Sequence, residues 1–292
     1  MVDFPFPISY QNVIKPQAKL IKTNLTVDIG RGVVSHPEEN CNKIKRSQTW
    51  NARIPTGYIN GSHWVSLICN NTLNIASLRS CLNNTNLIMS GDSTTRQYYQ
   101  YLTSKIVPDC KQITKKWTTP KWHEPAKCES KTRNLTILWN PHELPFVNAK
   151  REGQITNLKS TVEIVNGIKS GENVVFVIHY YCHLIRNHYT IFINQLRILK
   201  ESVKKVLLRN KQVKILIKSP YAFDVQDCKT QISDLHAKIY VEIIKRELRE
   251  FQDSIVYMNI WEMSVAMEQI GIHPKENVLW EHIQMMFGYI CK

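Results

Sequence analysis

Long hydrophobic runs are missing from this sequence. No stretch of about 18 or more apolar residues occurs, so no segment predicts a membrane-spanning helix. The opening stretch MVDFPFPISYQNVIKP lacks the basic start and continuous apolar block of a signal peptide, and we therefore expect the first methionine to mark a truncated or recombinant start. No internal repeat, low-complexity tract or coiled-coil heptad is visible, which excludes repeat architectures.

Cysteine spacing typical of metal sites is also absent. The eight cysteines form no CxxC pair and fit no zinc-ligand pattern. His179 and His183 have the spacing of helical metal ligands, but they fall on a predicted strand, where four residues span ~13 Å and one zinc ion cannot bridge them. We therefore predict no metal site.

An even number of cysteines favours disulfide bonds instead. Five Asn-x-Ser/Thr sequons occur, all in the first half of the chain, at Asn24, Asn60, Asn70, Asn83 and Asn134. Together these features indicate the lumen of the secretory pathway or the extracellular space.

Acidic residues are scarce relative to basic ones. With 38 Lys and Arg against 24 Asp and Glu, the net charge is +14, which favours polyanionic partners. Lysines interleave with Trp117 and Trp122 between residues 105 and 133, a pattern that suits nucleic acid. No helix-turn-helix, zinc finger or RNA-recognition signature accompanies it, so a solvated basic loop is the favoured interpretation and no nucleic-acid partner is predicted.

The chain divides into two parts by composition. Residues 1–80 are broken by proline and glycine and predict an irregular, disulfide-tied segment packed on a domain spanning 81–292. In that domain, apolar runs of strand length alternate with helical patterns. The predicted strands are 86–90, 134–139, 173–181, 212–219 and 254–261, and the predicted helices are 94–107, 192–206, 233–251 and 276–289. The helix 233–251 is predicted to place Ile239, Ile243 and Leu248 on one apolar face. This alternation predicts an α/β fold with a mainly parallel sheet between two helical layers.

The stretch IMSGDSTTRQYY has two interpretations. Gly91 permits a tight turn between a strand and a helix, and Ser93 follows where the first helical N–H groups point outward. In such sheets ligands bind at the carboxyl ends of the strands, so Ser93 is a candidate nucleophile whose own N–H forms part of an oxyanion hole. Ser, Asp and Thr are also the ordinary helix caps, so the same residues fit a purely structural role.

A nucleophilic serine needs a base, and His273 is the best candidate among the ten histidines. It lies in the stretch IGIHPKENVLW, on a loop that follows the fifth predicted strand, and Pro274 restricts the backbone beside it. A late loop of an α/β fold can reach the edge of the sheet where Ser93 lies.

Several stretches then resemble one family in their order and spacing. They are GDSTTRQ, NPHELPFV, VVFVIHYYCHL, ISDLHAK, IWEMSVA and IHPKENVLWEHIQMMFGYIC, and the resemblance is to the neurexophilin and PC-esterase (NXPE) family. It implies an SGNH-hydrolase-like fold, with Ser93 as nucleophile and His273 as base. It also implies an O-acetyltransferase or O-acetylesterase acting on acidic glycans or glycoproteins, including sialylated ones, with no bound cofactor and with acetyl-CoA as an acyl donor for transfer.

The residues around these two depart from the family pattern. Where SGNH enzymes carry an acid three residues before the histidine, this chain has Ile270, so Glu262 or Glu268 would have to substitute. Tyr181 and Cys182 replace a glycine and an amide that would serve the oxyanion. An alternative function is therefore a secreted glycan- or receptor-binding protein whose catalytic site has degenerated.

Four other residues complete the predicted site. His142 and His183 are retained from the family pattern and are predicted to line the pocket, although Glu143 stands where a glycine is favoured. Asp92 and Arg96 are predicted to form an ion pair that anchors the turn, and contact of Arg96 with an anionic substrate is the alternative.

Overall fold

A seven-stranded sheet forms the centre of the protein. The structure is a computed structural model, and it describes residues 37–113, 125–142, 159–184, 188–222, 234–269 and 271–291. The strand order is β4-β5-β6-β3-β7-β8-β9, and the five strands from β6 to β9 are parallel. These five are β3 (Asn86–Gly91), β6 (Leu135–Pro141), β7 (Val174–Ile178), β8 (Lys214–Lys218) and β9 (Val256–Met258). They are the five predicted strands, and the predicted α/β fold with a mainly parallel sheet is confirmed.

The order of the parallel strands determines where a ligand binds. Numbered along the chain they run 2-1-3-4-5, the doubly wound order in which the connections after the first strand, β3, and the third strand, β7, run in opposite directions. The crevice opens at the carboxyl ends of β3 and β7, where Gly91 is followed by Ser93 and Ile178 by His179. Polar side chains that follow these two strands therefore meet at one place.

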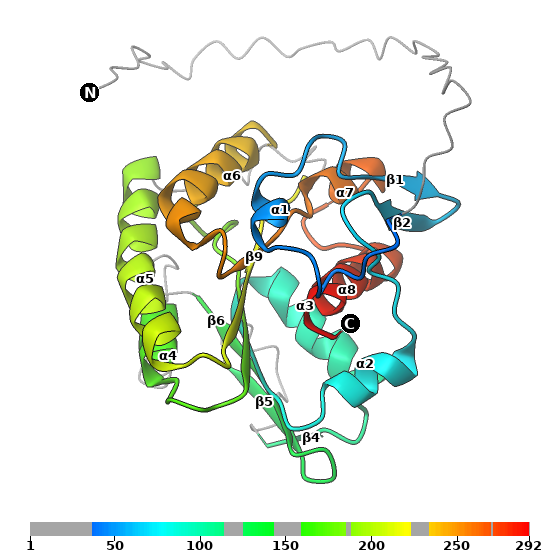
Figure 1. Ribbon diagram of the computed structural model, residues 1–292, viewed down its shortest axis with the longest axis vertical. Helices are drawn as coiled ribbons and strands as arrows, with labels where there is room; N and C mark the ends of the chain where they lie inside the picture. Colours follow the sequence, from blue (N-terminus) through cyan, green and yellow to red (C-terminus); the bar gives the residue numbers. More distant parts are fainter. Residues whose placement is uncertain are drawn as a thin grey trace. The chain divides into compact units, whose positions relative to one another are not determined.

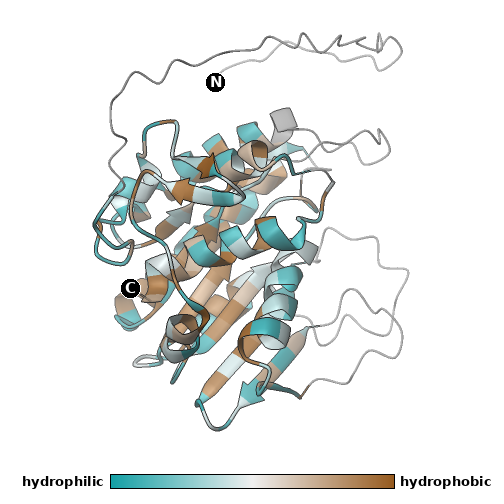
Figure 2. Ribbon diagram, turned by 90° about the vertical axis from the view of Figure 1, so that its right-hand side faces the viewer, coloured by the Kyte–Doolittle hydropathy of each residue, from teal (hydrophilic) through white to brown (hydrophobic). Residues whose placement is uncertain are grey.

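Helices cover both faces of the sheet (Figure 1). On one side α4 (Thr161–Gly167), α5 (Tyr189–Arg209) and α6 (Asp234–Leu248) pack in sequence. On the other side α3 (Ser93–Tyr101) packs against α8 (Glu276–Cys291), which also contacts α2 (Ile75–Cys81) and β9. The apolar strands lie between these layers, as the brown ribbons in Figure 2 show. Every residue of β7 and β9 is buried, which explains their unbroken apolar sequences.

An antiparallel edge was not predicted. β5 (Ala126–Ser130) pairs with β6, and β4 (Lys111–Gln112) pairs with β5. A disulfide between Cys110 and Cys128 fixes this edge. Part of the predicted basic loop is therefore sheet, whereas residues 114–124, with Trp117 and Trp122, lie outside the described residues.

Residues 37–80 contain short elements that contact the α/β core. They are α1 (Ser47–Trp50), the hairpin of β1 (Gly57–Asn60) and β2 (His63–Ser66), and most of α2. The Trp50 indole donates a 2.7 Å hydrogen bond to the Ile255 carbonyl. Disulfides join Cys41 to Cys69, and Cys81 in α2 to Cys291 at the end of α8. The division at residue 80 stays a prediction, and residues 1–36 lie outside the described residues.

Three detailed predictions were wrong or incomplete. Ile239 was placed on the buried face of α6 but is 43% exposed, because Ala237, Tyr240 and Val241 form the face that packs. The third strand ends at Ile178 rather than 181, and a turn closes where the Leu184 N–H bonds the Tyr181 carbonyl. The prediction of disulfide bonds is confirmed for six cysteines but is incomplete, because Cys182 is a buried free thiol; Cys228 lies outside the described residues.

Candidate active site

The structure brings Ser93 and His273 together. The hydroxyl Oγ of Ser93 lies 2.7 Å from Nε2 of His273, although 180 residues separate them in the chain. Ser93 is the first residue of α3, immediately beyond the end of β3. His273 lies on the loop between α7 (Trp261–Ala266) and α8. This is the geometry expected of a hydroxyl that passes its proton to an imidazole.

Local contacts hold the histidine loop against α3. The side-chain amide of Gln97, one helical turn after Ser93, donates a 3.2 Å hydrogen bond to the Pro274 carbonyl. Gly271 adopts a φ of 82°, a conformation that favours glycine and reverses the chain just before His273. Sequence reasoning missed Gln97, which lies within the GDSTTRQ stretch but whose partner is a distant carbonyl.

Gly91 allows β3 and the exit of β7 to approach closely. A Cβ atom at this position would lie 2.8 Å from Thr95 Oγ1 and 2.9 Å from the Cβ of His179. A side chain at position 91 would collide with these atoms, so the close packing before α3 requires glycine there. The predicted role of Gly91 in a tight turn is consistent with this packing.

Asp92 caps α3 and is buried beside the serine. Its Oδ1 accepts hydrogen bonds from the Thr94 N–H at 2.9 Å and the Thr94 hydroxyl at 2.7 Å, and its Oδ2 lies 3.3 Å from Nε2 of His179. Among the described residues no ion pair joins Asp92 to Arg96, so that prediction is wrong: the carboxylate faces Thr94 and His179. The Arg96 guanidinium instead lies over the Trp139 ring, 5.7 Å from its centroid.

The charges around Asp92 keep it ionised. Burial alone raises the pKa of this carboxyl, but His179, Lys218 and His183 outweigh burial and hold its pKa well below the ordinary value. The carboxylate is thus a fixed negative charge next to the nucleophile. It also opposes the lowering of the pKa of His273.

A buried lysine contacts the turn between β3 and α3, and the sequence did not predict it. Lys218, the last residue of β8, is fully buried and donates a 2.5 Å hydrogen bond to Thr94 Oγ1. Its ammonium lies about 5 Å from the ring centroids of Tyr98 and Tyr221. Burial lowers the pKa of Lys218 to about 8, against the opposing charge of Asp92. The only available signal was its position at the carboxyl end of a predicted strand.

The rings of two histidines stack beyond the carboxyl ends of the parallel strands. The rings of His142, after β6, and His183 lie 5.3 Å apart, and the His142 N–H bonds the Gly91 carbonyl at 3.3 Å. Burial, together with the charge of His183, lowers the pKa of His142 to about 3, so its ring is neutral at physiological pH. Neither ring nitrogen of His142 has a hydrogen-bond partner among the described residues. Both histidines thus lie near Gly91, and their role in lining a substrate pocket stays a prediction.

The two substituted residues, which follow β7, are buried in the protein. Tyr181 is fully buried and packs edge-on against Tyr221 at 5.2 Å, and the Cys182 thiol lies 3.1 Å from the Tyr221 hydroxyl. Burial raises the pKa of the Cys182 thiol well above its ordinary value, so this thiol is not an activated nucleophile. Among the described donors, the Ser93 N–H at the start of α3 stays available for an oxyanion.

In the part of the chain that the structure describes, no acid orients His273. Ile270, at the position of the expected acid, lies outside the described residues. Glu262 accepts hydrogen bonds from the Thr56 N–H and hydroxyl, at 2.6 and 3.0 Å, so it serves the hairpin region instead. Within the described part of the chain, neither Glu268 nor any other carboxylate forms an ion pair with His273.

The chain has a clear family match. The domain described as "NXPE family member 4-like, C-terminal domain" matches residues 64–291. The chain belongs to this family. The NXPE match covers both Ser93 and His273, and it ends at the last residue of α8.

A solved structure also resembles this NXPE family member, though weakly. It is described as a GDSL-like lipase from Parabacteroides merdae, with a TM-score of 0.39 and 13% identity, covering 72% of this chain and 97% of the other. At that score the likeness does not bear on activity. In the described residues no cluster of three potential metal ligands occurs, and no helix has the length and apolar character to cross a membrane.

Proposed function

We propose that this protein transfers or hydrolyses an acyl group through Ser93, with His273 as general base. The observation that carries the proposal is the 2.7 Å contact between Ser93 Oγ and His273 Nε2 at the carboxyl end of β3. The contact joins a residue of the sheet crevice to a residue of a distant loop. A helix cap alone does not require such a partner.

The chemistry follows from these atoms. His273 accepts the hydroxyl proton while Ser93 Oγ attacks the acyl carbonyl carbon, and the tetrahedral oxyanion accepts a hydrogen bond from the Ser93 N–H at the positive end of α3. Collapse of this intermediate breaks the bond to the leaving alcohol or thiol, which takes the proton from His273. A second attack on the acyl-serine, by water or by a sugar hydroxyl, then restores the free serine and yields the acid or a new ester.

The state of the base supports this order of events. Partial burial and the positive charge of Arg96 lower the pKa of His273 below 6.5, while Asp92 opposes them. The ring is therefore neutral at physiological pH and able to accept a proton. This is the state that the first step requires.

The substrates we propose are glycan hydroxyls and their acetyl esters, on acidic glycans or glycoproteins that include sialylated ones. A net charge of +14 attracts such polyanions, and acetyl-CoA would supply the acetyl group for transfer. We further propose a lumenal or extracellular location. Three disulfides support an oxidising compartment, and the sequons fit it.

One observation favours a binding role without turnover. Among the described residues no carboxylate orients His273, and a Ser-His pair without its acid reacts more slowly. In that case the protein would hold acidic glycans through its basic surface. Binding that weakens with salt and survives Ser93→Ala, in a protein without esterase activity, would support this second function.

Hydrolysis of a chromogenic acetyl ester, and transfer of acetyl from acetyl-CoA to a sialylated glycan, test the enzymatic function. Ser93→Ala and His273→Ala are each expected to lower kcat by at least about 1000-fold. Ser104→Ala, which removes an exposed hydroxyl from the segment after α3, is the matched control and should leave the rate unchanged. Equal rates in folded wild-type and Ser93→Ala proteins would refute the proposal.

A further inference from the structure

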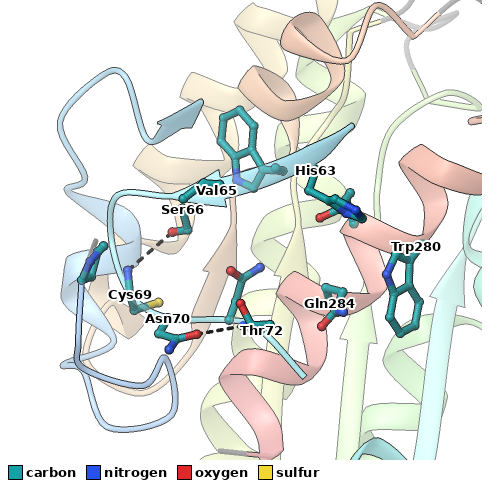
Figure 3. A pocket seen from close by; sticks show the side chains of 12 residues that line it. His63, Val65, Ser66, Cys69, Asn70, Thr72, Trp280 and Gln284 are labelled. Carbon is teal, nitrogen blue, oxygen red and sulfur yellow. Dashed lines mark hydrogen bonds and ion pairs between the residues drawn. The ribbon is translucent and has the colours of Figure 1, made fainter. Parts of the chain in front are cut away.

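A second cleft lies apart from Ser93 and His273, between the residues around β2 and α8 (Figure 3). Its volume is about 430 Å³, within the range of small-molecule sites. Its lining mixes aromatic and polar side chains, among them His63, Trp64, Asn70, Trp280 and Glu281. Asn70 is the asparagine of the sequon Asn-Asn-Thr that ends at Thr72. We propose that an N-linked glycan on Asn70 lies in this cleft, with its sugars extending towards Trp280.

The backbone around Asn70 is held in place. Its N–H donates to the Glu39 carbonyl at 2.8 Å, and its carbonyl accepts from the Cys41 N–H at 3.1 Å. The disulfide from Cys69 to Cys41 fixes the preceding residue. The side chain of Asn70 therefore leaves a rigid backbone at the wall of the cleft, and a sugar attached to it begins inside the cleft.

Hydrogen bonds hold the segment after Asn70 against α8. Gln284 accepts a 2.9 Å hydrogen bond from the Leu73 N–H and donates one of 3.0 Å to the Leu73 carbonyl. A Cβ on Gly288 would come within 2.7 Å of the Asn71 Cβ, so the sequon and the helix are in close contact there. One wall of the cleft is thus the sequon and the other is α8, which carries Trp280.

The asparagine side chain suits attachment. Its Oδ1 accepts a 3.0 Å hydrogen bond from the Thr72 N–H (dashed in Figure 3), and within the described residues its Nδ2 makes no hydrogen bond. The amide nitrogen that receives the sugar is therefore not used by the fold. A partly buried indole such as Trp280 offers an apolar face to the C–H groups of a pyranose ring.

The cleft also contains polar atoms that sugar hydroxyls can satisfy. They are those of His63 and Glu281, whose Nδ1 and Oε1 lie 2.8 Å apart, and of Asn71 and Thr72 in the sequon.

The proposal shares the lumenal location with the proposed function but does not depend on acyl transfer. Its test compares Asn70 with Asn60, the exposed sequon asparagine at the end of β1. The full chain is secreted from mammalian cells, and site-specific occupancy is measured by mass spectrometry. Native protein is then treated with an amidase that removes N-glycans. We expect both sites to be occupied and release at Asn70 to be at least tenfold slower than at Asn60.

Variants show whether the cleft causes the protection. Trp280→Ala should bring release at Asn70 within twofold of Asn60, and His63→Ala, at the exposed rim, gives a second variant if Trp280→Ala does not fold. Tyr189→Ala, an exposed aromatic residue on α5, is the control and should leave the protection unchanged. Asn70 left unoccupied, or equal release at both asparagines, would overturn the proposal. Ser93→Ala should still show slow release of the Asn70 glycan. The test of the glycan proposal is therefore independent of the test of acyl transfer.

Discussion

Replacing Lys218 with methionine should make the protein more stable. The lysine is fully buried, and within the described part of the chain its ammonium makes one hydrogen bond, to Thr94, besides its contacts with the Tyr98 and Tyr221 rings. Methionine has a similar length and no charge. The substitution therefore removes a poorly solvated charge while keeping most of the packing.

The magnitude follows from the pKa. A fall from 10.5 in the unfolded chain to about 8 in the folded protein means that folding with a protonated lysine costs roughly 3 kcal/mol at pH 7. Loss of the hydrogen bond to Thr94 costs about 1 kcal/mol, and Asp92 keeps its bonds from Thr94. The net gain is about 2 kcal/mol, or about 4–8 °C in Tm.

The pH dependence gives the decisive signature. Because the folded pKa is the lower one, the penalty of the charged lysine is fully present below pH 8 and disappears as pH rises towards 10.5. Urea unfolding at several pH values should therefore show the advantage of Lys218→Met at pH 7 and its loss near pH 10. Lys211→Met, at an exposed lysine before β8, should stay within about 0.5 kcal/mol of wild type. A Lys218→Met protein that is less stable than wild type at pH 7 would refute this reasoning.

Three further predictions concern the turn, the base and a disulfide. Gly91→Ala should destabilise the protein by about 2 kcal/mol in urea unfolding, since the new Cβ meets Thr95 and His179; full stability would show that the close contact is absent. The esterase rate should fall as pH drops and His273 becomes protonated, with a midpoint below 6.5, and a midpoint above 7 would contradict the lowered pKa. Removing the Cys81–Cys291 disulfide by a double alanine substitution should cost about 5 kcal/mol, because it closes a loop of 210 residues; a change below 1 kcal/mol in calorimetry would be inconsistent with that loop entropy.

The parallel strands could be predicted because they are buried on both faces. The run in β7 is apolar without interruption, and β8 has three apolar residues between two lysines, which is typical of strands covered by two helical layers. The antiparallel strand β5 alternates buried and half-buried residues over only five positions in a lysine-rich stretch, so it resembled a loop. Ile239 was misplaced because its hydropathy outweighed that of Tyr240 and Ala237, whose burial depends on packing against neighbouring helices.

The site was predictable only in part. Ser93 and His273 stand in recognisable local sequences, and the sheet order explains why their strand and loop meet. The contacts of Asp92 with His179, and of Lys218 with Thr94, join residues of three different strand ends. Nothing in the local sequence of any one strand reveals such a partner, which is why the pairing of Asp92 with Arg96 was predicted wrongly.

Covalent labelling of Ser93 tests the central claim most directly. A fluorophosphonate reacts with a serine only where a base removes the hydroxyl proton, and the adduct is located by peptide mass spectrometry. The account predicts an adduct on Ser93 in wild type, none on the Ser93→Ala protein, and labelling slowed at least 100-fold in His273→Ala. A folded wild-type protein that gains no adduct on Ser93, or that labels at the same rate without the His273 imidazole, would contradict it.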